Sequence, residues 1–170
     1  MKITKLCILT MTVVAWTRAA QAQTPKWSMA AQGCVPEPGS ISRLVQNATG
    51  AVTFAPMAMG AAFVICPVSV FTSTAQCGMR LSLTAADPDG SGATYRARAF
   101  LNNLPTGSGP VGSITGVASS SVPKGIDTAA VNSVVDFTSN YYYIVIELFR
   151  GNSAANPAFY GVALVDDVCS

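Results

Sequence analysis

The 170-residue sequence contains no histidine, and this absence excludes several classes of chemistry. Without histidine there is no Ser-His-Asp or Cys-His catalytic group, no histidine-bound metal and no histidine pH switch. The sequence also lacks the phosphate-loop and G-x-S-x-G motifs. Carboxylate chemistry is the main route that remains for an enzyme of this composition.

Charged residues are scarce as well, at 11% of the chain, and no cluster of lysine and arginine is present. The sequence therefore predicts no nucleic-acid partner. A glycoside hydrolase needs two carboxyl groups on either side of the sugar bond, and no such pair is marked among the eight acidic residues. We therefore expect a protein that is not an enzyme, with a carboxylate-based glycoside hydrolase as a less favoured alternative. The acidic residues are Glu37, Asp87, Asp89, Asp127, Asp136, Glu147, Asp166 and Asp167.

The first 22 residues have the pattern of an export signal. Lys2 and Lys5 form a short basic start, residues 6–16 are apolar apart from two threonines, and Ala20-Gln21-Ala22 is an A-x-A cleavage sequence. The apolar run is shorter than the roughly 20 residues of a membrane-spanning helix. We expect cleavage of a signal peptide, residues 1–22, a secreted or periplasmic location, and no membrane span afterwards. The alternative is a buried N-terminal helix.

Removal of the signal peptide changes the charge and the cysteine count. Residues 23–170 keep seven of the ten basic residues and all eight acidic ones, so the net charge falls from +2 to −1. Four cysteines remain, and an even number in an exported chain predicts two disulfides with three possible pairings. Their spacing contains no C-x₂₋₄-C pair, which argues against a structural zinc site. These cysteines are Cys34, Cys66, Cys77 and Cys169.

Short apolar or alternating runs, separated by Gly, Pro, Asn and Asp, predict an all-β fold. Their number and spacing favour a single antiparallel β-sandwich domain at residues 40–170, preceded by an irregular segment at residues 23–39. Residues 127–137 also fit a helix, but their β-branched residues favour a strand. The expected strands are residues 40–46, 51–55, 61–66, 79–85, 93–101, 111–118, 127–137, 141–150 and 159–168.

Residues 79–101 contain two alternating runs joined by the turn sequence Asp87-Pro-Asp-Gly-Ser-Gly92. This pattern predicts a β-hairpin with a long loop. The core-facing side chains would be Met79, Leu81, Leu83 and Ala85 on the first strand, and Tyr95, Ala97, Ala99 and Leu101 on the second.

The turn itself has the D-x-D-G-x-G spacing of the first half of a calcium loop, with Asp87 and Asp89 as the metal ligands. The twelfth position of such a loop normally supplies a bidentate carboxylate, and here it is Arg98. We expect an ordinary turn and no cofactor, with calcium as the one metal that the spacing leaves open.

Residues 141–150 (YYYIVIELFR) form the clearest strand of the sequence. Strand alternation places Tyr142, Ile144, Ile146 and Leu148 on the core side. Tyr141, Tyr143 and Glu147 then share the other face, where tyrosine rings can stack on sugars and a carboxylate can accept hydroxyl hydrogen bonds. Arg96 and Arg98 either join this surface or pair with Glu147. The alternative is that these rings only pack against cross-strand neighbours.

The segment from Cys34 to Val68 contains Cys34-Val-Pro, two short strands and Phe63-Val-Ile-Cys66-Pro-Val68. It resembles small secreted bacterial β-sandwich proteins of unassigned function that share a Cys…Cys-Pro-Val pattern. The resemblance implies a jelly-roll-like sandwich and a Cys34–Cys66 disulfide, with Cys77–Cys169 following. Cys66–Cys77 together with Cys34–Cys169 is the competing pairing.

These observations favour a secreted, non-catalytic β-sandwich protein with a structural or interaction role. Its partner is not readable from the sequence, although a polysaccharide or another surface protein would fit. The alternative is a carbohydrate-binding module that uses Tyr141, Tyr143 and Glu147, together with Arg96 and Arg98. A fibre subunit is less favoured, because no donor strand is marked in the sequence.

Disulfide reduction is expected to lower the melting temperature sharply. Each bridge restricts the unfolded chain and contributes roughly 2–4 kcal/mol in the loop-entropy picture. Thermal unfolding followed by circular dichroism, with and without excess reductant, measures the effect. Identical melting curves would count against both bridges.

Overall fold

The computed structural model describes residues 25–69, 79–89, 93–104, 110–114, 126–131, 135–137 and 140–166. Within these ranges the chain consists of strands and two short 3₁₀ helices. The expected signal peptide lies outside them. The elements are β1 (Pro25–Ala30), η1 (Ala31–Gly33), β2 (Val35–Pro36), η2 (Pro38–Arg43), β3 (Leu44–Gln46), β4 (Val52–Phe54), β5 (Gly60–Pro67), β6 (Met79–Ala86), β7 (Tyr95–Leu104), β8 (Gly112–Ile114), β9 (Ile126–Ala130), β10 (Tyr141–Arg150) and β11 (Ala158–Asp166).

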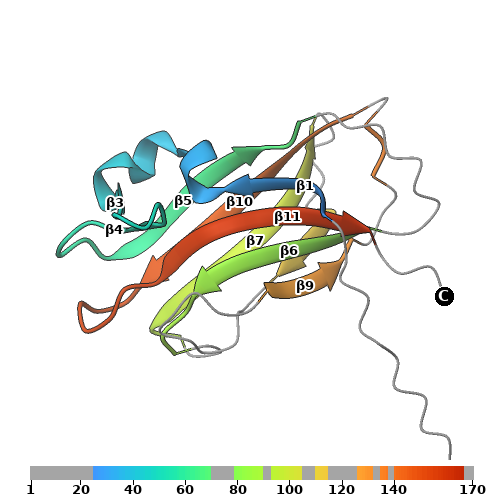
Figure 1. The fold of residues 1–170 in the computed structure, drawn as a ribbon. Helices are drawn as coiled ribbons and strands as arrows, with labels where there is room; N and C mark the ends of the chain where they lie inside the picture. The colour runs from blue at the N-terminus through green and yellow to red at the C-terminus, as the bar shows by residue number, and fades with distance from the viewer. Residues whose placement is uncertain are drawn as a thin grey trace, which may run out of the picture.

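The strands form two antiparallel sheets that pack face to face (Figure 1). One sheet has the order β3-β4-β11-β6-β9, with β1 added beside β11, and the other has the order β2-β5-β10-β7-β8. The expected all-β antiparallel sandwich is therefore confirmed. No helix in the described ranges is long and apolar enough to cross a membrane.

The core lies between the two sheets and is built from alternate residues of the long strands. The side chains expected to face it on β6, β7 and β10 are all buried. Ser82 alternates with the core-facing residues of β6, so the pattern places it on the solvent side. It is buried as well, and β6 is an interior strand that lies between β11 and β9. The largest fully buried side chains include Phe54, Phe159, Leu81, Leu83, Leu101, Ile144, Ile146, Leu148 and Leu164.

The strand pairing of residues 79–101 differs from the expected hairpin. β6 pairs with β11 and β9, whereas β7 pairs with β10 and β8 in the other sheet. The connection that begins at Asp87 therefore crosses from one layer of the sandwich to the other. Alternation specified correctly which side chains face the core, but an alternating strand carries no information about which strand it pairs with.

The N-terminal segment also differs from its prediction as irregular chain. Residues 25–30 form the edge strand β1, which pairs with residues 161–165 of β11. Trp27 is buried in the core and anchors this strand. Residues 40–46, expected as a strand, are 3₁₀ helix up to Arg43, and only residues 44–46 form β3. Pro38 in the first turn of η2, with its fixed φ, favours the helical start.

One disulfide is present among the described residues. Cys34 and Cys66 are bonded, with their Cα atoms 4.3 Å apart, and the bridge ties the start of β2 to β5. This confirms the pairing that the resemblance implies and rules out the competing one, which needed Cys34–Cys169. The second expected bridge, Cys77–Cys169, falls outside the described residues and stays a prediction.

Arg150, the last residue of β10, is buried inside the protein. Its position on the strand points inward, and the residue is only 6% exposed. The guanidinium donates hydrogen bonds of 2.9–3.4 Å to five main-chain carbonyl oxygens. The acceptors belong to Ala55, Ala58, Asn152, Ser153 and Ala155. A single side chain thereby fixes both the β4–β5 and the β10–β11 connections.

Substitution of Arg150 with methionine is expected to destabilise the fold strongly. The change keeps an unbranched apolar stem but leaves several partly buried carbonyl groups without this donor, at a cost of about 3 kcal/mol. Urea unfolding of the variant measures the change in free energy. Arg43→Met is the matched control, because Arg43 makes one exposed hydrogen bond, to the carbonyl of Ala61. Equal stability of the two variants would contradict the role of Arg150.

Candidate functional site

The outer face of the five-stranded sheet carries every residue that the sequence suggested for sugar binding. We use this name for the side chains of β5, β10 and β7 that point away from the core. Cross-strand pairing brings Glu147 between Phe63 and Arg98, and Phe149 between Ala61 and Arg96. The face consists of Ala61, Phe63, Ile65 and Pro67 on β5, Tyr141, Tyr143, Val145, Glu147 and Phe149 on β10, and Arg96, Arg98, Phe100 and Asn102 on β7.

Glu147 is held between two arginines. Its Oε1 lies 3.5 Å from Nη2 of Arg96, and its Oε2 lies 3.7 Å from Nη1 of Arg98. The Glu147 side chain is only 13% exposed, whereas the two arginine side chains are 31% and 32% exposed. Both expectations for the arginines are met together, because they share the outer face and also pair with the carboxylate.

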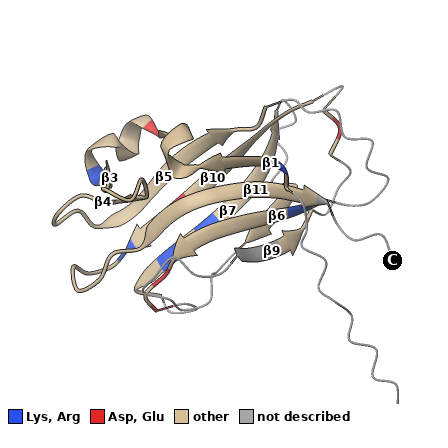
Figure 2. Cartoon of the chain, viewed as in Figure 1, with Lys and Arg blue, Asp and Glu red and all other residues tan. Residues whose placement is uncertain are grey.

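These ion pairs change the expected role of Glu147. Each of its oxygens already faces a guanidinium group, so the carboxylate is not free to act as the principal acceptor of sugar hydroxyl groups. The groups that meet solvent are instead the N–H donors of the more exposed arginines. Figure 2 shows how few charged positions the sheets carry, with positive ones on β7.

Phe149 is covered by a cation. The guanidinium carbon of Arg96 lies 4.3 Å from the centre of the Phe149 ring, which is a cation–π contact. This ring therefore supports an arginine and does not offer a free stacking surface. Among the described residues, the Nε atom of Arg96 is buried and has no hydrogen-bond partner.

The rings that remain accessible are at the other end of β10. Tyr141 is 73% exposed, and Tyr143 is half-buried beside Pro67 and Asn102. Phe63 and Phe100 are also half-buried and extend the aromatic surface onto β5 and β7. The outer face thus combines a short aromatic region around the tyrosines with a cluster of two arginines and one glutamate.

Asp87 and Asp89 organise the connection between the two sheets. Asp89 accepts hydrogen bonds from the main-chain N–H groups of Thr94 and Tyr95, at 3.0 and 3.2 Å. Asp87 is fully buried, and its Oδ2 accepts the N–H of Ala97 at 3.2 Å. These bonds shape a connection between the two sheets, and not the hairpin turn that the sequence predicted.

The structure leaves the expectation about calcium untested. Residues 90–92 of the turn lie outside the described residues. No group of three or more Asp, Glu, Cys or His side chains that could hold a metal exists among the residues described. The expectation of no cofactor, with calcium as the one metal left open, therefore stays a prediction, and both carboxylates already serve the main chain.

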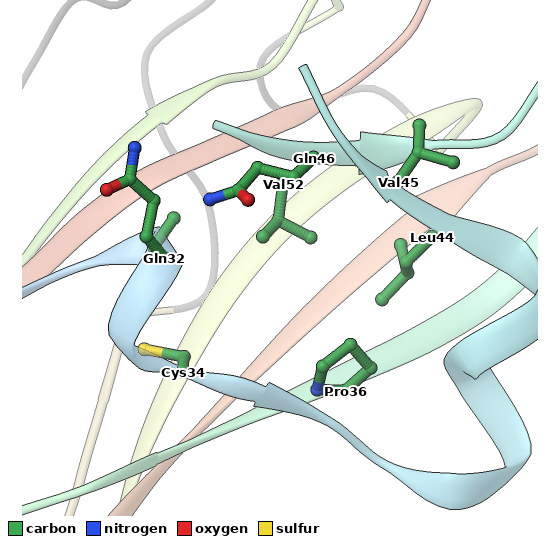
Figure 3. Close-up of a pocket in the computed structure, with 8 residues that line it drawn as sticks. Gln32, Cys34, Pro36, Leu44, Val45, Gln46 and Val52 are labelled. Carbon is green, nitrogen blue, oxygen red and sulfur yellow. The ribbon is translucent and has the colours of Figure 1, made fainter. Parts of the chain in front are cut away.

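A pocket that the sequence did not indicate lies beside the disulfide (Figure 3). It has a volume of about 130 Å³ and lies between η1, β2, β3 and β4. Gln32 and Gln46 direct their amide groups to one end, and Pro36 and Leu44 line the other. No charged side chain lines it, so it offers amide hydrogen bonds and apolar contact only. Its lining residues come from four elements, so no single stretch of the sequence indicated the pocket.

A solved cellulose-binding domain shares the β-sandwich fold of this chain. No protein-family model matches the chain, and no curated protein matches it. The second N-terminal cellulose-binding domain of the Cellulomonas fimi β-1,4-glucanase C superposes on it with a TM-score of 0.52 at 12% identity, covering 88% of this chain and 99% of that domain. At this identity the likeness shows a common β-sandwich fold.

Two further solved structures are less similar. The xylan-binding module CBM15 gives a TM-score of 0.46 at 17% identity and covers 85% of this chain and 99% of that module. A family two carbohydrate esterase from Cellvibrio japonicus gives a TM-score of 0.43 at 14% identity, covers 83% of this chain, and is matched over 33% of its own length. This chain thus spans about a third of the esterase.

Replacement of Asp87 by asparagine is expected to change how stability depends on pH. Burial, together with the neighbouring Asp89 carboxylate, raises the pKa of Asp87 from 3.8 to about 6. Because the folded protein holds this proton more tightly than the unfolded chain, the stabilisation is complete below pH 3.8 and is lost as the pH rises to about 6. Asparagine does not titrate, and its oxygen can still accept the N–H of Ala97.

The measurement is the difference in unfolding free energy between the wild type and Asp87→Asn from about pH 4 to pH 7. We expect the wild type to lose stability relative to the variant across this interval. Glu37→Gln, which removes the same charge at an exposed position, is the control. A difference that does not vary with pH would show that Asp87 is not the titrating group.

Proposed function

We propose that this protein is a carbohydrate-binding module that holds a polysaccharide chain on the outer face of the five-stranded sheet. The observation that carries the proposal is the alignment of Tyr141 and Tyr143 on one strand, in the same face as Arg96 and Arg98. Aromatic rings provide apolar stacking surfaces, and nearby polar groups provide orientation, which is the usual composition of a site for a small polar ligand.

The fold supports the same proposal. The domain that superposes with a TM-score of 0.52 is a cellulose-binding domain, and nearly its whole length is covered. Fold alone does not determine function, so the argument rests on the side chains of the outer face and the fold adds to it. The expected jelly-roll-like connectivity belongs to this proposal too, and the repeated crossing of the chain between the sheets supports it.

The Cys34–Cys66 disulfide fits the secreted or periplasmic location that such a module needs, because disulfides persist in oxidising compartments. Glu147, in the expected sugar surface, is engaged by two arginines. Asp87 and Asp89 accept main-chain hydrogen bonds. These contacts give the three carboxylates structural roles and argue against their being a pair poised to cleave a glycosidic bond.

Binding to polysaccharides is expected to depend on the two tyrosines. Affinity electrophoresis in gels containing neutral or acidic polysaccharides, with pull-down on insoluble ones, measures binding by the purified protein. Tyr141→Ala and Tyr143→Ala should each weaken binding by roughly tenfold, equivalent to about 1.4 kcal/mol. Tyr141→Ala should leave stability nearly unchanged, because Tyr141 is exposed.

Tyr160→Ala is the matched control, since Tyr160 is a half-buried tyrosine of β11 in the other sheet. It should retain binding. Absence of binding to every polysaccharide, or equal losses in all three variants, would contradict the proposed site and favour a protein partner.

A further inference from the structure

The outer face of the five-stranded sheet carries an excess of positive charge. Arg96 and Arg98 contribute two cationic groups and Glu147 one anionic group, while every other side chain of this face is uncharged. The expected mature chain has a net charge of −1, so the face differs in sign from the molecule as a whole. A chain bound across β7 and β10 would meet this local positive charge.

Arg96 has more donors than its contact with Glu147 uses. A guanidinium group has five N–H donors, and Glu147 meets Arg96 through one oxygen, Oε1. The contacts at 3.5 and 3.7 Å are ion pairs that are longer than typical charge-assisted hydrogen bonds of 2.7–2.9 Å. The Nε atom of Arg96 is buried and has no hydrogen-bond partner within the described part of the chain, so a ligand would meet the Nη groups of this arginine.

Arg96 is held in place before any ligand arrives. Its guanidinium carbon lies 4.3 Å from the centre of the Phe149 ring, and its Nη2 contacts Oε1 of Glu147. Both contacts come from β10, which pairs with β7 over the full length of β10. A group that is already ordered loses less conformational freedom on binding, so its interaction with an anion is stronger.

We propose that the ligand of this face is an anionic polysaccharide, recognised by Arg96 with the support of Arg98. This inference rests on the proposed carbohydrate-binding function and specifies its ligand class. The planar guanidinium fork matches carboxylate, sulfate and phosphate groups, which it can contact through two parallel hydrogen bonds. A uronic-acid carboxylate and a sulfate ester provide the same chemistry, while Tyr141 and Tyr143 contact the sugar rings.

The test compares polymers that differ only in charge. Binding of the purified protein is measured by affinity electrophoresis and calorimetry with polygalacturonate, with the same polymer after chemical reduction of its carboxyl groups, and with dextran sulfate beside plain dextran. We expect at least tenfold tighter binding to one acidic polymer than to its uncharged counterpart. We also expect this preference to weaken as salt is raised, because salt screens exposed charges.

Two variants identify the residues responsible. Arg96→Gln should reduce binding to the acidic polymer at least tenfold, and Glu147→Gln, which removes the only negative charge of the face, should strengthen it. Arg80→Gln is the control, because Arg80 is a half-buried arginine on β6 in the other sheet. Melting temperatures of all three variants are measured to confirm that they fold.

The outcomes separate this inference from the proposed function. Equal binding to the acidic and the uncharged polymer, with loss in Tyr141→Ala, would overturn the charge preference and leave the carbohydrate-binding function intact. No binding to any polymer would overturn both. Preference for polygalacturonate identifies a uronate ligand, and preference for dextran sulfate identifies a sulfated one. Wild-type affinity of a folded Arg96→Gln for the acidic polymer would also overturn the inference.

Discussion

The alternation of side chains along β10 is the constraint on which both the core and the candidate site depend. Ile144, Ile146 and Leu148 fill the core, and the residues between them form the centre of the outer face. Because a strand has a period of two, a shift of one residue would bury Glu147 and expose Ile146. The ladders to β5 and β7 fix the register, and the register sets the position of Glu147 relative to Arg96 and Arg98.

The same alternation places the charged side chain of Arg150 in the interior, at the end of β10. Arg150 occupies an inward position, where a hydrophobic residue would be expected, and burial of an unpaired charge is costly. Five carbonyl oxygens, from the β4–β5 and β10–β11 connections, replace the water that the guanidinium loses. The shape of these connections is therefore coupled to the register of β10, although they lie at the edge of the sandwich.

The fold was predictable from the sequence where it depends on local patterns, and unpredictable where it depends on pairing. The faces of β6, β7 and β10 followed from the alternation of apolar residues, because burial acts on each side chain separately. The partners of β6 and β7 did not follow, since two strands close in sequence can join different sheets when the turn between them crosses the core. β1 was missed because its buried anchor is a single residue, Trp27, in a segment otherwise rich in proline and polar residues.

The candidate site shows the same division, and its chemistry follows from the cross-strand neighbours of β10. The placement of Tyr141, Tyr143 and Glu147 on one face was expected from β10 alone, whereas the aromatic neighbours Phe63 and Phe100 required the order of the sheet. That order also sets β7 beside β10, so that both arginines reach Glu147 and one of them covers Phe149.

A surface that seemed from one strand to combine rings with a carboxylate acceptor is therefore a surface of rings with arginine donors. The cross-strand neighbours of β10 decide this polarity. The sequence suggested Arg96 and Arg98 for this surface, but it left open whether they join it or pair with Glu147. A shared fold does not determine this polarity, because it fixes the path of the strands and leaves their outward side chains free to vary. In the proposed carbohydrate-binding function, the preference for an acidic or a neutral sugar chain is accordingly a property of Arg96, Arg98 and Glu147, and not of the β-sandwich that carries them.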